Sequence, residues 1–288
     1  DKFSLTLQSE TSTKLMILFP NAKINLGLDI LRKRPDGYHD IETVMVPVPW
    51  CDVLEIVPAK GSETTLTVSG RKVECPMEKN LVMKAYRALE AEVSLPPVDI
   101  YLRKIIPDGA GLGGGSSDAS FTLLALNELF SLGYNREELA RIASTLGSDC
   151  PFFIYNTPML CTGTGTDMEP VELDLKGHSI LIVKPQVSVP TAAAYSHTTP
   201  AIPSTPIRDI IASPISSWEG RLKNDFEPSV LPAYPAIADV KRSIKEMNPI
   251  YTAMSGSGAS VFGIFGNDIL SPVIRERFQG CDTLVATL

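Results

Sequence analysis

The segment Ile105–Ser120 constrains this chain more than any other, because it combines five glycines, two adjacent serines and an immediate change to helical periodicity. Glycines remove the side chains that would keep an anion away from backbone N–H groups, and they permit the positive φ angles of a concave nest. From Ser116 onward apolar residues recur with a helical period, so a helix is predicted to begin where the glycines stop. Its N-terminus would direct unpaired N–H groups at the loop, which predicts a phosphate site.

A flexible linker is the other interpretation of a segment rich in glycine and serine. The preceding residues argue against it, because Val98, Ile100 and Leu102 alternate with polar residues as in a strand. The segment therefore lies between a predicted strand and a predicted helix. No lysine follows the last glycine, so it is not a G-x-x-x-x-G-K-S/T loop, nor is it the dinucleotide fingerprint in a clean parallel unit. The predicted cradle is of another type.

Composition limits the classes of function. A length of 288 residues predicts two domains, or one domain with a substantial second lobe. The net charge of -7 argues against a general nucleic-acid binder. No apolar run reaches the roughly 18 residues of a membrane span, so no membrane partner is expected. Five widely spaced cysteines without a C-x-x-C pair predict unbridged thiols in a reducing cytoplasm. The three histidines have no zinc-like spacing relative to them.

A predicted strand and the loop after it carry candidate site residues near the start of the chain. Ala22–Ile30 alternates as a strand, and Lys23 and Asn25 lie on one side of it, either in a site or on a solvated face. A turn-rich loop then delivers Tyr38 and His39, which can stack on a planar base or merely hold the loop. Residues 60–75 predict a β-hairpin.

Asp149 is a lone carboxylate between two predicted elements. A helix is predicted over 136–146 before it, and an apolar strand is predicted at 152–154 after it. Another helix is predicted earlier in the chain, over 80–92. An aspartate at a helix end or turn is the ordinary interpretation of such a position. Catalysis is the alternative.

The composition changes near residue 157, where prolines and small residues become frequent. We therefore predict an N-terminal domain at 15–157 and a C-terminal domain at 158–288. The polar residues before them predict a mobile extension at 1–14. A second glycine-rich turn, Ser255–Gly258, leads into an apolar strand.

Three motifs in this order, Pro20–Gly27, Pro107–Ser117 and Met254–Ala259, resemble the three signatures of the GHMP kinases, named for galactokinase, homoserine kinase, mevalonate kinase and phosphomevalonate kinase. The resemblance spans nearly the whole chain after residue 15. It implies an α+β fold with two lobes, an N-terminal ATP-binding lobe of the ribosomal protein S5 domain 2-like type and a C-terminal α/β sandwich. Arg34–His39 and Leu146–Phe153 narrow it to members that phosphorylate a cytidine diphosphate-linked polyol.

The resemblance also implies roles for single residues. Lys23 and Asp149 would form the catalytic pair, with Asp149 accepting or orienting the proton of the substrate hydroxyl. The cofactors would be ATP and Mg²⁺, and the enzyme would be a cytoplasmic monomer or weak homodimer. The implied ATP-binding residues are Asn80, Lys104, Pro107, Gly109, Ala110, Gly111, Leu112, Gly113, Gly114, Gly115, Ser116 and Ser117, the two serines lying near the metal. The implied substrate-binding residues are Asn25, Tyr38, His39, Thr191, Tyr195, Gly256, Ser257 and Gly258.

Two positions depart from the fuller glycine pattern of the family. Ala110 is small enough to be harmless, whereas an acidic Asp108 near phosphates must point away or bind through metal. Three other functions compete with the implied one. They are another kinase of this family acting on homoserine, mevalonate or a sugar, a non-catalytic paralogue that binds ATP and a metabolite, and a dehydrogenase. The last is disfavoured, because the strand before the loop is not that of a buried parallel core.

Overall fold

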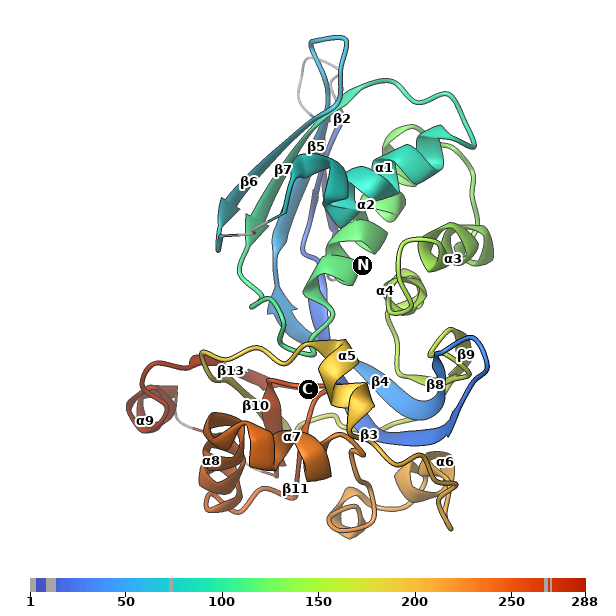
Figure 1. Ribbon diagram of the computed structural model, residues 1–288. Helices are drawn as coiled ribbons and strands as arrows, with labels where there is room; N and C mark the ends of the chain where they lie inside the picture. Colours follow the sequence, from blue (N-terminus) through green and yellow to red (C-terminus); the bar gives the residue numbers. More distant parts are fainter. Residues whose placement is uncertain (1–3, 9–13, 73–74, 267–268, 270) are drawn as a thin grey trace. The chain divides into compact units, whose positions relative to one another are not determined.

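The computed structural model describes residues 4–8, 14–72, 75–266, 269 and 271–288 of the chain (Figure 1). These residues form two compact units, and each is described by itself. Unit 1 comprises the described residues of Asp1–Ala22 together with Pro49–Asp108 and Gly113–Thr157. Unit 2 comprises Lys23–Val48, Gly109–Leu112 and the described residues of Pro158–Leu288. Two segments that precede residue 157, Lys23–Val48 and Gly109–Leu112, therefore belong to unit 2. The domain boundary at 157/158 stays a prediction.

Unit 1 is built on a five-stranded sheet in the order β1-β2-β5-β7-β6. Its strands are β1 (Ser4–Gln8), β2 (Lys14–Leu18), β5 (Val53–Pro58), β6 (Thr65–Gly70) and β7 (Val98–Lys104). The hairpin predicted at 60–75 is wrong, because β6 pairs in parallel with β7 and the chain between them forms a helical crossover. Residues 4–8 of the predicted extension form β1, whereas 1–3 and 9–13 lie outside the described residues.

The described part of unit 1 also contains the α-helices α1 (Leu81–Glu90), α2 (Gly114–Leu129), α3 (Arg136–Ser144) and α4 (Cys150–Tyr155). Helix α2 contacts β2, β5 and α1, and it buries Phe121, Leu123 and Leu126 (Figure 1). The predicted helices over 80–92 and 136–146 are confirmed with shorter bounds. The strand predicted at 152–154 is wrong, because these residues lie in α4. A short apolar run is compatible with a buried helix as well as with a strand.

Unit 2 contains two four-stranded sheets. One has the order β3-β4-β8-β9, and it includes β3 (Asn21–Lys33) except its first two residues, β4 (His39–Cys51) up to Val48, β8 (Met159–Thr162) and β9 (Asp167–Pro170). The other has the order β11-β12-β10-β13, formed by β10 (Ser179–Lys184), β11 (Tyr251–Met254), β12 (Val261–Phe265) and β13 (Asp282–Thr287). All pairings of this second sheet are antiparallel. In unit 1, the strand before the glycine loop, β7, pairs in parallel with β6 but antiparallel with β5, so it is not part of an all-parallel sheet of the dehydrogenase type.

The helices of unit 2 are α5 (Thr191–Ser196), α6 (Ile207–Ile211), α7 (Glu227–Ala233), α8 (Pro235–Lys245) and α9 (Ser271–Arg277). Helix α8 contacts β11 and β12, and its buried Ile237, Val240 and Ile244 join a core cluster with residues of β3 and β10. Phe226 belongs to the same cluster. The core of unit 2 therefore extends from β3, the strand of Lys23 and Asn25, to the sheet that contains β10.

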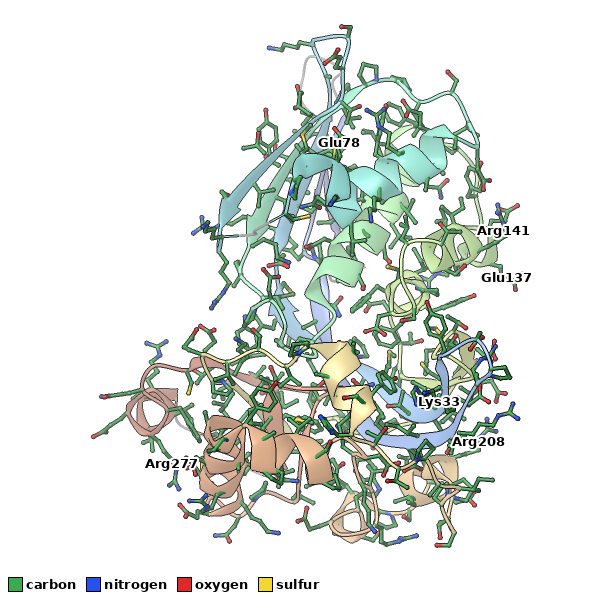
Figure 2. All side chains as sticks on the ribbon, in the orientation of Figure 1. Lys33, Glu78, Glu137, Arg141, Arg208 and Arg277 are labelled. Carbon is green, nitrogen blue, oxygen red and sulfur yellow. The ribbon has the colours of Figure 1, made fainter. Side chains whose placement is uncertain are left out.

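Charged side chains such as Glu137, Arg141, Arg208 and Arg277 lie on the surface (Figure 2). The exposed pairs that they form, such as Arg141 with Glu92, are each worth little, because solvent screens them. Among the described residues, no helix is both long and apolar enough to cross a lipid bilayer.

Candidate active site

A chain of hydrogen bonds fixes the predicted polar side of β3. Lys23 Nζ donates to Asn25 Oδ1 over 2.7 Å, and Asn25 Nδ2 donates to Thr43 Oγ1 over 3.0 Å. The Thr43 hydroxyl in turn donates to the carbonyl of Gly27 over 2.6 Å. Lys23 and Asn25 are only 4% and 2% exposed, which rules out the solvated face. Burial of an ammonium is costly without partners, so this network is what holds Lys23 in place.

The first half of the glycine loop pairs with the second glycine turn within unit 2. Ser260 N donates to the Ala110 carbonyl over 3.1 Å, and Ser255 Oγ donates to the Gly111 carbonyl over 2.8 Å. On the other side of the loop, Lys23 N donates to the Leu112 carbonyl over 2.9 Å. Three segments far apart in the sequence thus meet, and they are the three motifs singled out from the sequence.

Gly111 sits where the loop and the turn are closest. Its φ is +71°, and a Cβ at this position would lie 2.0 Å from the Ser255 carbonyl oxygen. Real Cβ atoms do not approach oxygen so closely, so only glycine fits. The glycine is therefore required for packing as well as for backbone conformation.

Helix α2 begins at Gly114, two residues before the predicted start, with Gly113 as a left-handed N-cap of φ 71°. Gly114 belongs to the first turn and faces Ile106, since a Cβ on it would lie 3.0 Å from Ile106 Cγ2. Ser117 is fully buried, and its Oγ finds no hydrogen-bond partner among the described residues. An unsatisfied buried hydroxyl in the first turn of a helix suits a ligand oxygen or metal at this end.

Asp149 also belongs to unit 1, in the turn between α3 and α4. It precedes α4 as the N-cap residue without a capping hydrogen bond, and its place in a turn at a helix end agrees with the ordinary interpretation. Ser120 Oγ donates to the Cys150 carbonyl over 2.7 Å, which ties the start of α4 to α2. Burial raises the pKa of the Cys150 thiol to about 11, against hydrogen bonds from Ser116 and Ser120. The pairing of Asp149 with Lys23, which belongs to unit 2, stays a prediction.

Lys104 is held by two carboxylates that the sequence analysis did not identify. Its Nζ bonds to Asp52 and lies 2.7 Å from Asp118 Oδ2, and all three side chains are buried. Burial lowers the pKa of Lys104, but the two carboxylates outweigh it and raise the pKa. Burial raises the pKa of Asp118, and the nearby Asp52 carboxylate adds to this rise, whereas Lys104 opposes it. The triad anchors the loop, since Asp52 also accepts from Ile106 N over 2.8 Å.

The remaining ATP-site candidates of unit 1 lie around the same end of α2. Asn80 caps α1 by accepting from Val82 N over 2.9 Å. Pro107 is buried, whereas Asp108 is exposed in a turn, consistent with a carboxylate that points into solvent. Gly115 is close to Leu81 of α1, since a Cβ on it would lie 3.6 Å from Leu81 Cδ1. The roles of these residues toward ATP stay predictions.

Aromatic rings gather around the predicted base site in unit 2. His39 stacks on Tyr195 with ring centroids 4.7 Å apart and 15° between the ring planes. Tyr195 also meets Phe226 edge-on at 4.8 Å. No third ring fits between His39 and Tyr195 at this spacing, whereas Tyr38 is 68% exposed. Thr191 Oγ1 lies 3.4 Å from Ser257 Oγ, so α5 reaches the glycine turn.

The fixed strand β3 also carries a carboxylate whose titration can be measured. Burial, reinforced by the Asp225 and Glu42 carboxylates and opposed by Lys223, raises the pKa of Asp29 from 3.8 to about 7. A folded-state pKa above the unfolded one means that the native protein binds more protons between these values, so stability falls as pH rises from about 4 to 7. We expect Asp29→Asn to remove this loss and to raise the urea midpoint at pH 8. An unchanged difference between the pH 5 and pH 8 midpoints would contradict the shift.

Two family models match the chain. The model of the GHMP kinases N terminal domain matches residues 80–157, and that of the GHMP kinases C terminal matches residues 211–279. A protein of Parabacteroides distasonis named 4-diphosphocytidyl-2-C-methyl-D-erythritol kinase is 53% identical over 250 residues, which cover 87% of this chain and 92% of that protein. A Bacteroides fragilis protein of the same name is 51% identical over 252 residues, with the same shares of 87% and 92%.

Solved structures agree with these matches. A crystal structure of 4-(cytidine 5'-diphospho)-2C-methyl-D-erythritol kinase superimposes with a TM-score of 0.79 at 30% identity, covering 94% of this chain and 98% of that chain. Homoserine kinase from Cytophaga hutchinsonii superimposes with a TM-score of 0.70 over 99% of this chain and 97% of that one, but at 19% identity it shows the fold alone. The mixed helix and sheet fold expected from the sequence is confirmed.

Proposed function

We propose that this chain, which belongs to the GHMP kinase family, transfers the γ-phosphoryl group of ATP to the 2-hydroxyl of 4-diphosphocytidyl-2-C-methyl-D-erythritol. This reaction serves the non-mevalonate isoprenoid precursor pathway. Relatives about half identical over most of the chain carry the name of this activity. The observation that carries the proposal is the meeting of three segments in unit 2: the Lys23–Asn25 strand, the loop 109–112 and the Ser255–Ser260 turn.

In this proposal, Asp149 accepts or orients the proton of the attacking hydroxyl, and Lys23 keeps that carboxylate ionised and offsets charge on the phosphoryl group. Asn25 orients the acceptor hydroxyls, because its amide is fixed by Thr43 and Lys23. In-line phosphoryl transfer depends mainly on such positioning and on charge stabilisation, and it needs no covalent nucleophile.

ATP is the phosphoryl donor of this family, and the Gly109–Ser117 segment suits its phosphates. The buried, unsatisfied Ser117 hydroxyl supports a role for Ser117 and Ser116 in holding Mg²⁺, which would neutralise phosphate charge. Most of the other ligands of such an ion are phosphate oxygens and waters. Gly113, Gly114 and Gly115 leave the backbone N–H groups accessible to the phosphates.

Tyr38, His39 and Tyr195 recognise the cytosine in the proposed complex, with Thr191 and the turn Gly256–Gly258 completing the substrate side. The close His39 and Tyr195 stack means that the base binds against exposed Tyr38 or displaces His39 from Tyr195. We also propose a cytoplasmic enzyme, in keeping with its five cysteine thiols, that acts as a monomer or weak homodimer without nucleic acid or membrane partners.

One assay tests the activity. The protein is incubated with ATP, Mg²⁺ and the cytidyl-methylerythritol alcohol, and ³¹P NMR is used to look for a new phosphomonoester. We expect that signal, and we expect CMP to raise the apparent KM for the alcohol while leaving the KM for ATP unchanged. Turnover of homoserine, mevalonate or galactose in place of this alcohol would assign the chain to another kinase of the family. ATP binding without consumption of ATP by any of these acceptors would identify a non-catalytic paralogue.

A further inference from the structure

The segment Asn224–Glu227 contacts the end of β11 and the glycine turn through two side chains. Asn224 Nδ2 donates to the carbonyls of both Met254 and Gly256, over 2.7 and 2.8 Å. Its Oδ1 accepts from Phe226 N over 2.9 Å, and the residue is only 3% exposed. Glu227 Oε1 accepts from Met254 N over 2.7 Å. Helix α7 begins at Glu227, and Asp225 and Phe226 form a turn before it.

The same segment is fixed to β3. Leu28 N donates to the Lys223 carbonyl over 2.8 Å, and Asp225 N donates back to the Leu28 carbonyl over 2.9 Å. Asp225 Oδ2 then accepts from Ile30 N over 2.8 Å. Three hydrogen bonds, two to Asp225 and one to the preceding residue Lys223, therefore join this part of the chain to β3, the strand that carries Lys23 and Asn25.

The turn that Asn224 holds lies against Asn25. A Cβ on Gly256 would lie 3.4 Å from Asn25 Oδ1, so these two groups are neighbours. The hydrogen bonds between the turn and the nucleotide loop are made by other residues, through Ser255 Oγ and the backbone N–H groups of Ala259 and Ser260. Gly256 itself has only van der Waals contact with the loop, since a Cβ on it would lie 3.6 Å from Gly111 Cα. Asn224 thus holds Gly256, the residue of the turn that lies beside Asn25.

We infer that Asn224 is a positioning residue for the phosphoryl acceptor: it fixes the Gly256 peptide against Asn25 and thereby aligns the acceptor alcohol. The inference rests on the proposed function. Only a primary amide fits, because it supplies two donors to two carbonyls. A carboxylate at 224 would direct negative charge at both carbonyl oxygens, and a shortened side chain would leave them without a donor.

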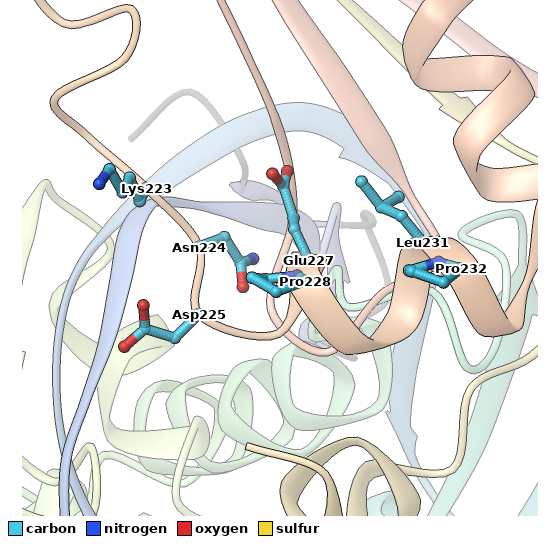
Figure 3. A pocket seen from close by; sticks show the side chains of 7 residues that line it. All are labelled: Lys223, Asn224, Asp225, Glu227, Pro228, Leu231 and Pro232. Carbon is cyan, nitrogen blue, oxygen red and sulfur yellow. The ribbon is translucent and has the colours of Figure 1, made fainter. Parts of the chain in front are cut away.

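A cavity of about 380 Å³ lies along this segment and is lined by Asn224, Glu227, Leu231 and their neighbours (Figure 3). Asn224 lines this cavity, so a shortened side chain at 224 leaves space that water can enter. We therefore expect Asn224→Ala to fold, which makes it a suitable second variant beside Asn224→Asp.

Steady-state kinetics of both variants test the inference. We expect the KM for the alcohol to rise and kcat to fall, each by about tenfold, the loss typical of one or two buried hydrogen bonds, with an unchanged KM for ATP. The matched control is Asn127→Asp, because the Asn127 amide also bridges backbone groups, donating to the Tyr134 carbonyl and accepting from Tyr134 N over 3.0 Å each. This control is expected to keep both KM values and kcat.

Hydrogen exchange separates this inference from the activity itself, because it needs no turnover. Amides of residues 254–258 are expected to exchange faster in Asn224→Asp than in the wild type, and to be unaffected in Asn127→Asp. Wild-type protein that fails to phosphorylate the alcohol would refute the proposed function, whatever the exchange shows. Unchanged exchange at 254–258 would overturn the positioning of the turn by Asn224. Equal increases in the KM values for alcohol and ATP would overturn its acceptor-specific role.

Discussion

Replacing Asp149 by asparagine is expected to lower kcat by about 10²- to 10⁴-fold, the usual contribution of a general base. The amide has the size of the carboxylate but cannot accept the hydroxyl proton. Asp149 precedes α4, whose first residue is bound to α2 through Ser120 Oγ and the Cys150 carbonyl. Because this connection uses the backbone of Cys150, the substitution leaves α2 and the nucleotide site in place. ATP affinity, measured by calorimetry, is therefore expected to stay unchanged.

The matched control is Asp239→Asn, which removes an exposed carboxylate of α8 that is paired with Arg242. A solvent-screened pair of this kind contributes little, so its kcat is expected to equal that of the wild type. Full turnover of Asp149→Asn would remove Asp149 from the mechanism. Weaker ATP binding with an unchanged kcat would move Asp149 from the acceptor to the nucleotide.

Features that depend on neighbouring residues were predictable from the sequence. The two-residue period of β3 places Lys23 and Asn25 on one side, and their 2.7 Å hydrogen bond confirms it. The glycines and the helical period placed the loop and α2 correctly, with an error of two residues at the helix start. The helix begins at Gly114, within the glycines, although the low helix propensity of glycine predicts a later start.

Features that depend on distant residues were not predictable. Asp52 and Asp118 are recognised as partners of Lys104 only once the fold brings them together from 52 and 14 positions away. The role of Asn224 was missed for the same reason, since its acceptors lie 30 and 32 positions further along the chain. The parallel pairing of β6 with β7 also needs a crossover that a hairpin pattern conceals. Long-range pairing therefore accounts for the failed hairpin and for the residues that were missed. The strand wrongly predicted at 152–154 has a local cause, because a short apolar run suits a helix as well as a strand.

Gly111→Ala is expected to abolish most of the activity by separating the glycine loop from the Ser255–Ser260 turn. The new Cβ would lie 2.0 Å from the Ser255 carbonyl oxygen, and 3.1 Å from that of Gly258, so the backbone must shift. A displacement of about 1 Å in a positioning element costs roughly 10²-fold in rate, and we expect kcat/KM for ATP to fall by at least that factor. Overpacking is also expected to lower the free energy of unfolding by about 1–3 kcal/mol beyond the backbone strain.

Gly133→Ala separates the clash from the strain. Gly133 has a φ of +82°, similar to that of Gly111, but nothing lies within 4 Å of the position of a Cβ there. Both variants incur the strain of an alanine at positive φ, roughly 1–2 kcal/mol, and only Gly111→Ala also meets a backbone oxygen. Urea unfolding and ATP kinetics of the two variants should therefore differ by the contribution of the clash alone. If both variants lose the same stability and both keep wild-type kcat/KM, contact between the loop and the turn is not needed for phosphoryl transfer.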